Sequence, residues 1–108
     1  MDKINEYLNR TRNTRTYPDG FTVEGNRPRL VCKDGFSVSV QASSYHYCSP
    51  RVDGADKYET VELGYPSTAD QLIADYAECY DNLTNTVYGN VPVSIVNELI
   101  EKHGGIVY

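Results

Sequence analysis

Apolar residues recur with helical spacing in three parts of the chain. Ile4, Tyr7 and Leu8 share one helix face after Asp2, a good N-cap residue, and predict a helix over residues 3–10. Ser67 predicts the start of a second helix, which carries an apolar stripe of Leu72, Ile73, Tyr76, Ala77 and Tyr80. A third helix is expected from Pro92 to the paired glycines at 104 and 105, which end it.

Strand-like alternation dominates the middle of the chain. Residues 36–42 place Phe36, Val38, Val40 and Ala42 on one face, and Asp34-Gly35 before them is a strong hairpin signal that pairs them with residues 29–33. Residues 57–65 predict the next strand. Shorter strands are expected at 21–23 and 86–88, and residues 106–108 are expected to add an edge strand or pack as a tail.

This order of elements, α-β-β-β-α-β-α, predicts one compact α+β domain over residues 1–108. A small antiparallel sheet of about four strands has helices packed mainly on one of its faces. Residues 11–20 are polar and end in the turn signal Pro18-Asp19-Gly20, so we expect a flexible arm or a surface loop there.

Composition and charge narrow the function classes. The chain of 108 residues has 40% apolar residues, and no apolar run approaches the ~20 residues that cross a bilayer. Without a recognisable signal segment at the start, we expect a cytoplasmic protein. The net charge of −5 divides into +2 for residues 1–54 and −7 for residues 55–108. That balance argues against direct nucleic-acid binding and fits solvated acidic faces or a homo-oligomer.

The candidates for reactive chemistry are three cysteines and a histidine close to one of them. Cys32, Cys48 and Cys79 are an odd, irregularly spaced set that we interpret as free thiols. His46 and Cys48 form half of a metal site or a thiolate–imidazole pair, but the sequence supplies no second half-site and no oxyanion loop. We therefore expect no metal and no cofactor, and keep a cysteine- or metal-dependent enzyme as an alternative.

Aromatic residues give the strongest functional indication. The chain has ten tyrosines and no tryptophan, and tyrosine is enriched at recognition surfaces. Tyr45, His46, Tyr47 and Arg51 share one loop, and stacking rings beside a guanidinium suit a nucleotide-like ligand or a protein hot spot. The alternative is that these rings only anchor the loop. The full set of candidate ligand-binding residues is Tyr45, His46, Tyr47, Arg51, Tyr65 and Tyr88.

A second candidate surface is acidic. The side chains of Asp70, Asp75, Glu78 and Asp81 would form it if residues 67–81 were helical. Such a surface can mimic phosphates and inhibit a host protein that binds nucleic acid, although a charged helix face is more often simply solvated.

Several motifs together resemble a family of small uncharacterised proteins encoded by bacteriophages and prophages. The matching segments are RLVCKDGFSVSVQAS at 29–43, YCSPR at 47–51, VELGYPS at 61–67, TVYG at 86–89, VPV at 91–93 and EKHGG at 101–105. The resemblance implies an accessory protein made in an infected bacterial cell. By analogy, such a protein binds stoichiometrically and counters host defence, by sequestering a nucleotide-like immune signal or by blocking a host defence protein.

Overall fold

The computed structural model describes residues 2–107, except for the side chains of residues 22–24, and confirms an α+β fold. Two helices accompany a four-stranded antiparallel sheet and a separate two-stranded ribbon. The elements in chain order are α1 (Lys3–Arg10), β1 (Thr14–Thr16), β2 (Thr22–Glu24), β3 (Leu30–Val31), β4 (Ser37–Gln41), β5 (Thr60–Gly64), the 3₁₀ turn η1 (Ala74–Tyr76), β6 (Val87–Pro92) and α2 (Val93–Lys102).

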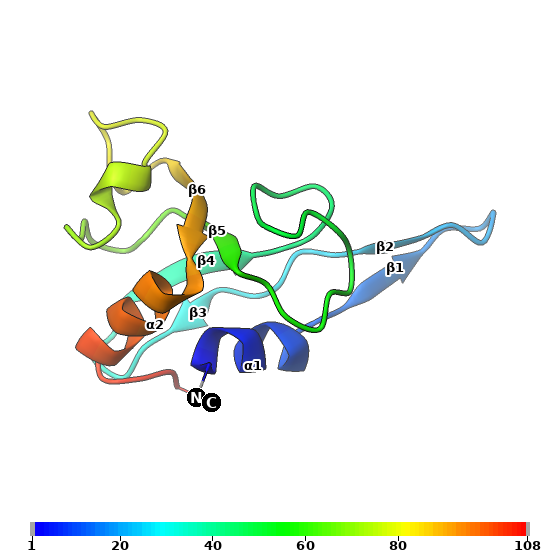
Figure 1. The fold of residues 1–108 in the computed structure, drawn as a ribbon, viewed down its shortest axis with the longest axis horizontal. Coiled ribbons are helices and arrows are strands. Elements are labelled where there is room, and N and C mark those ends of the chain that lie inside the picture. Colours follow the sequence, from blue (N-terminus) through cyan, green and yellow to red (C-terminus); the bar gives the residue numbers. More distant parts are fainter. Residues whose placement is uncertain (1, 108) are drawn as a thin grey trace.

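The main sheet has the strand order β3-β4-β5-β6. The predicted hairpin at Asp34-Gly35 is present, with Leu30 opposite Val38 and Gly35 in the left-handed region at φ +96°. The helices α1 and α2 lie side by side against the sheet (Figure 1), joined where the Ile4 N–H donates to Asn97 Oδ1 at 2.9 Å. Their apolar residues complete one core, whose fully buried members include Ile4, Leu8, Val38, Val40, Val61, Leu63, Val91, Val96 and Leu99.

A buried amide fastens α1 to the chain before β5. Asn5 Nδ2 donates to the Tyr58 carbonyl at 2.9 Å, and Asn5 Oδ1 accepts from the Tyr58 N–H at 2.7 Å. The same Nδ2 donates to Asp2, which also caps the helix by accepting from the Asn5 N–H at 3.2 Å. One side chain thus satisfies both backbone groups of a buried residue, as a neighbouring strand would.

The second predicted helix is wrong apart from the single turn η1. The Asp70 side chain accepts from the Leu72 N–H at 3.0 Å, which makes a tight turn, and does not cap a helix. Further along, the Glu78 N–H donates to the Val87 carbonyl at 3.0 Å, and Ala77 forms a bridge with Tyr88. Pairing with β6 therefore replaces helical hydrogen bonds in this segment, although Ile73 still enters the core.

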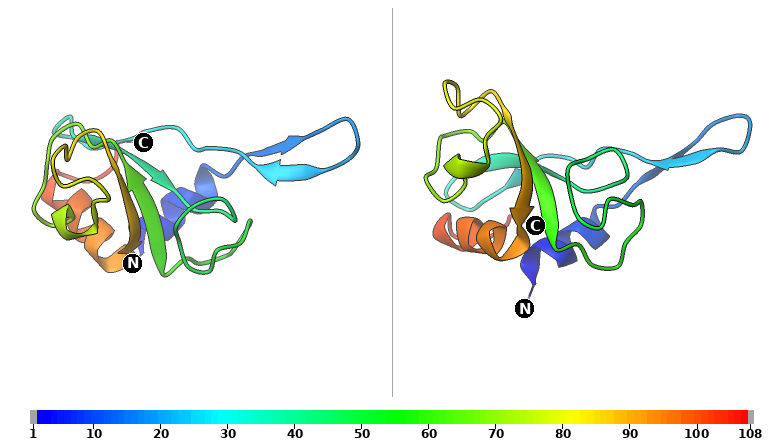
Figure 2. Two further views of the ribbon diagram at one scale, coloured as in Figure 1. Left: turned by 90° about the horizontal axis from the view of Figure 1, so that it is seen from above. Right: turned by 45° about the horizontal axis from the view of Figure 1, so that its top comes forward.

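Residues 14–24, which we call the arm, form a projecting β-ribbon (Figure 1; Figure 2). β1 and β2 pair antiparallel, with Thr14 opposite Glu24, and all three residues of β1 are exposed. The predicted arm at 11–20 and strand at 21–23 are thus parts of one hairpin, closed by the Tyr17 N–H donating to the Phe21 carbonyl at 2.8 Å. The arm's flexibility stays a prediction.

Residues 106 and 107 lie beside β3. Ile106 forms a β-bridge with Cys32, and the Val107 N–H donates to the Val31 carbonyl at 2.8 Å, so these two residues cover the outer edge of β3.

Pro92 is the last residue of β6 and occupies the N-cap position of α2, which begins one residue later than predicted. None of the helices within residues 2–107 is long and apolar enough to cross a membrane.

An ionic cluster closes the last turn of α2. His103 Nδ1 lies 2.7 Å from Asp34 Oδ2 and its Nε2 lies 3.1 Å from Asp70 Oδ2. The His103 ring stacks on Phe36 with centroids 4.0 Å apart, and Lys102 Nζ contacts Asp70 at 3.0 Å. The cluster ties α2 both to the β3–β4 turn and to the segment that was expected to be helical.

These carboxylates make stability sensitive to acid. Burial raises the pKa of Asp70, but hydrogen bonds from Leu72, Lys102 and His103 lower that pKa more. The pKa of Asp34 is lowered by hydrogen bonds from the Phe36 N–H and from His103. Because both folded pKa values lie below those of the unfolded chain, about 3.9, their stabilisation is present above about pH 4 and is lost as pH falls through the folded values. We expect the free energy of unfolding, from urea titrations, to drop as pH falls below about 4, and to drop less in Asp70→Asn.

The control for this prediction is Asp81→Asn, which changes an exposed carboxyl outside the cluster. It should retain the acid sensitivity of the unmodified protein. Equal pH dependence of stability in Asp70→Asn and the unmodified protein would contradict the assignment to Asp70.

Candidate functional site

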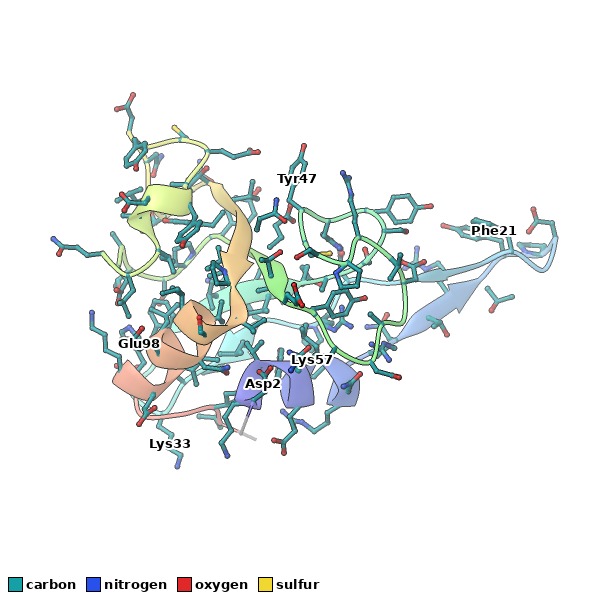
Figure 3. All side chains as sticks on the ribbon, in the orientation of Figure 1. Asp2, Phe21, Lys33, Tyr47, Lys57 and Glu98 are labelled. Carbon is teal, nitrogen blue, oxygen red and sulfur yellow. The ribbon has the colours of Figure 1, made fainter. Side chains whose placement is uncertain are left out.

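The predicted recognition loop, residues 43–56, presents its aromatic side chains in two directions. Tyr45 and His46 face the arm, whereas Tyr47 points outward from the loop (Figure 3). Arg51 lies over the Tyr47 ring, with Cζ 5.1 Å from the ring centroid, and its Nε donates to the Ser44 carbonyl at 3.1 Å. The structure therefore divides the four predicted residues into two pairs.

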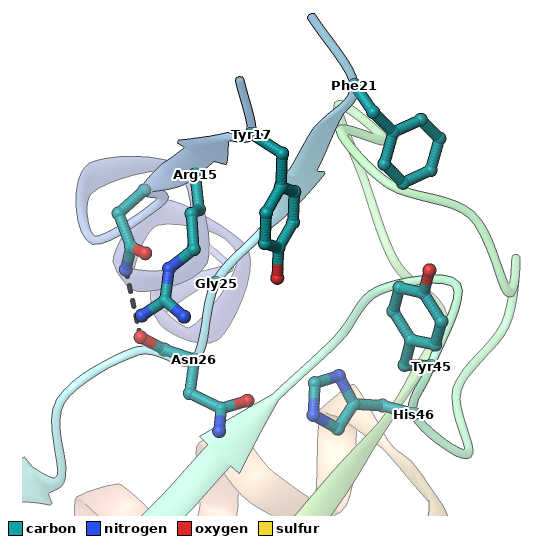
Figure 4. A pocket seen from close by; sticks show the side chains of 8 residues that line it. Arg15, Tyr17, Phe21, Gly25, Asn26, Tyr45 and His46 are labelled. Atoms are coloured by element: carbon teal, nitrogen blue, oxygen red, sulfur yellow. Dashed lines mark hydrogen bonds between the residues drawn. The ribbon is translucent and has the colours of Figure 1, made fainter. Parts of the chain in front are cut away.

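A cleft of about 550 Å³ separates the arm from this loop. Its lining combines aromatic rings, amides and one guanidinium (Figure 4), and the residues are Asn13, Arg15, Tyr17, Phe21, Gly25, Asn26, Tyr45 and His46. The rings of Tyr17 and Phe21 come from the arm and those of Tyr45 and His46 from the loop, around the same space. We call this space the arm–loop cleft.

Local hydrogen bonds hold the loop side of the cleft. The buried Ser43 Oγ lies 2.6 Å from His46 Nδ1 and accepts from the Tyr45 N–H at 3.1 Å. The next residue, Ser44, donates its N–H to Asp53 Oδ1 at 2.9 Å, which closes the loop on itself. Both aromatic residues of this wall are consequently positioned by one buried hydroxyl.

The arm side is organised around Asn13. Its Nδ2 donates to the Asn26 carbonyl at 2.9 Å, and the Gly25 N–H donates to the Asn13 carbonyl at 3.0 Å. A Cβ at position 25 would lie 2.3 Å from Asn13 Oδ1, so a larger residue there would displace the Asn13 side chain. Arg15 supplies the cleft's positive charge, and none of the eight lining residues is acidic.

Two of the predicted ligand-binding tyrosines lie elsewhere. Tyr88 is fully buried and its hydroxyl donates to the Leu83 carbonyl, so its selection as a ligand-binding residue is wrong. Burial also raises the pKa of its phenol. Tyr65 is half-exposed, but it sits just after β5, where its carbonyl accepts from Arg29, and it does not line the arm–loop cleft.

The geometry around Cys48 does not favour a reactive thiolate. Cys48 is buried, burial raises the pKa of its thiol, and Sγ donates to the Ser43 carbonyl at 3.2 Å. His46 Nδ1 contacts Ser43 Oγ, so the two predicted partners are each engaged by Ser43. Among the side chains that the structure describes, no three from His, Cys, Asp or Glu are placed to hold a metal ion.

The predicted acidic surface loses one of its four members. Asp70 is buried and bound by Lys102 and His103, so its selection as a surface residue is wrong. Asp75, Glu78 and Asp81 are exposed, and Asp75 accepts a hydrogen bond from Tyr80 at 3.2 Å. Asp75 lies in η1, and Glu78 and Asp81 lie in the segment after it, so the three do not form the continuous helix face that the hypothesis assumed.

The arm's contribution to the cleft was not expected from the sequence. Tyr17 and Phe21 flank the turn signal Pro18-Asp19-Gly20, and two large exposed aromatics beside a turn in a polar segment are a signal that could have been used.

Comparison of the chain with family models, curated proteins and solved structures finds no match.

Proposed function

We propose that this protein is a non-enzymatic binding protein that holds a nucleotide-like small molecule in the arm–loop cleft. One observation carries the proposal: exposed aromatic rings from two separate segments surround a space that also contains a guanidinium, and none of its described lining residues is a carboxylate. Rings stack on a planar base, and arginine pairs with a phosphate through charge-assisted hydrogen bonds.

The size and the exposure of the lining residues support a ligand of this class. The cleft volume of about 550 Å³ falls within the roughly 300–1,000 Å³ range of small-molecule sites. Tyr17, Phe21 and Tyr45 are 45%, 58% and 64% exposed, which is unusual for three large rings near one another. Asn13, Asn26 and His46 add groups that can bond the polar edge of a base.

The resemblance to small phage and prophage proteins suggests the setting for this activity. In the cytoplasm of an infected bacterium, a stoichiometric binder would lower the free concentration of a nucleotide-like immune signal. Counter-defence of this kind needs no catalysis, only tight binding and sufficient protein. Blocking a host defence protein through the same rings is the alternative, and a homo-oligomer is compatible with either.

Replacing Tyr45 is expected to weaken ligand binding without affecting the fold. Loss of one stacking ring costs about 1–3 kcal/mol, so Tyr45→Ala should raise Kd by roughly 5- to 150-fold. The measurement is calorimetry against a panel of mononucleotides, ADP-ribose derivatives and cyclic dinucleotides.

Tyr80→Ala is the matched control, because Tyr80 is 62% exposed but lies outside the cleft. The Tyr80→Ala variant should bind the panel nucleotide with the same affinity as the unmodified protein. If no member of the panel binds the unmodified protein, the nucleotide proposal fails. If both variants lose affinity equally, the assignment to this cleft fails.

A further inference from the structure

We propose that the buried Arg27 is a positioning residue that sets the separation between the two walls of the arm–loop cleft. The inference rests on the proposed function for its effect on ligands, but its geometric part concerns the chain alone. Arg27 does not line the cleft; it acts through the segments that carry the lining residues.

The contacts of Arg27 join three segments that are far apart in the sequence. Nε donates to the Leu8 carbonyl of α1 at 3.1 Å, and Nη1 donates to the Ala42 carbonyl at 3.0 Å. Its backbone N–H donates to Gln41 Oε1 at 2.8 Å, and Gln41 Nε2 returns a hydrogen bond to the Arg27 carbonyl at 3.0 Å. Arg27 and Gln41 therefore form a buried clamp between the segments that lead to the two walls of the cleft.

Each wall of the cleft adjoins a residue that belongs to this clamp or is held by it. Asn26, which lines the arm side, precedes Arg27, and its carbonyl holds Asn13. Ser43, which positions Tyr45 and His46, follows Ala42, whose carbonyl accepts from the guanidinium. A shift of the clamp would therefore move the arm and the loop relative to each other.

The shape of the guanidinium matters as much as its charge. Arginine holds its donors in a rigid planar fork, so contacts to Leu8 and Ala42 fix two directions at once. Lysine keeps the charge but concentrates its donors on one flexible ammonium, which cannot reproduce that fork. Binding constellations lose affinity when their supporting groups allow even small displacements.

Arg27→Lys is the variant that tests the inference. We expect about tenfold weaker binding of whichever panel nucleotide binds the unmodified protein, measured at a temperature where the variant is fully folded. The comparison variant is Ile100→Val in the core of α2, which destabilises the fold without touching the clamp. Unchanged affinity in Ile100→Val shows that lost stability alone does not weaken binding.

A distance measurement tests the geometric role of the clamp without any ligand. Spin labels at Pro18→Cys on the arm and Val52→Cys on the loop report the separation of the walls, in a Cys79→Ser background that removes the exposed native thiol. We expect one narrow distance distribution in the parent and in Ile100→Val, and a shifted or broadened distribution in Arg27→Lys.

The outcomes separate this inference from the proposed function. If no nucleotide binds but the distances change in Arg27→Lys, the proposed function fails and the geometric role of Arg27 stands. Identical distributions in Arg27→Lys and the parent, or a broad distribution in the parent itself, overturn the positioning role. Changed distances with unchanged affinity overturn its relevance to the ligand.

Discussion

Tyr88→Ala is expected to lower the free energy of unfolding by about 3–5 kcal/mol, the range for truncating a large buried aromatic side chain. Tyr88 has 0% exposure, is the second residue of β6 opposite Leu63 of β5, and is part of the hydrophobic core. Its hydroxyl donates to the Leu83 carbonyl, so truncation leaves both a cavity and an unpaired acceptor. Urea unfolding followed by circular dichroism measures this loss.

The same variant tests whether Tyr88 belongs to the core and not to the site. Per folded molecule, Tyr88→Ala should bind the nucleotide as the unmodified protein does, whereas Tyr45→Ala should lose affinity and keep its stability. Tyr88→Phe, which removes only the hydroxyl, should cost about 1 kcal/mol. A Tyr88→Ala protein that is as stable as the parent but has lost its ligand would reverse the assignment of the two tyrosines.

Asn5→Ala is expected to destabilise the protein by about 2–5 kcal/mol, because it leaves two buried backbone groups without their partner. The Asn5 amide bonds both the N–H and the carbonyl of Tyr58, at 2.7 and 2.9 Å. Alanine supplies neither group, and its higher helix propensity recovers only about 0.7 kcal/mol. The thermal midpoint should fall by about 8–30 °C for a domain of this size.

Asn9→Ala provides the matched control on the same helix. Asn9 Nδ2 also donates to a distant carbonyl, that of Asp56 at 3.0 Å, but this contact is exposed to water. Its loss should change the free energy of unfolding by less than about 0.5 kcal/mol. Similar losses in both variants would show that the Asn5–Tyr58 pair has no special role.

Local signals in the sequence were sufficient for much of the fold. The Asp34-Gly35 turn and the alternation of residues 36–42 fixed one hairpin, and the spacing of Ile4, Tyr7 and Leu8 fixed α1. These features depend on neighbours within a few residues. The segment after Ser67 did not form the predicted helix, and its Asp70 is instead bound by Lys102 and His103, 32 and 33 residues away. Periodicity carries no information on such partners.

For the same reason, the loop side of the candidate site could be predicted from the sequence and the arm side could not. Tyr45 and His46 were selected because they lie together in one polar loop, and the structure places both in the arm–loop cleft. Tyr17 and Phe21 join them only because the arm projects on the same side as that loop. That placement depends on the clamp between Arg27 and Gln41, two polar residues that composition alone would assign to the surface.

The exposed ribbon also affects how freely the sequence can evolve. All three residues of β1 point into solvent, so the core makes few demands on what stands at these positions. Substitutions there can change the arm side of the arm–loop cleft while the remainder folds as before. Under the proposed function, a lineage that meets a new ligand would therefore diversify first in this hairpin, and a library randomised at Arg15, Tyr17 and Phe21 would explore the same freedom in the laboratory.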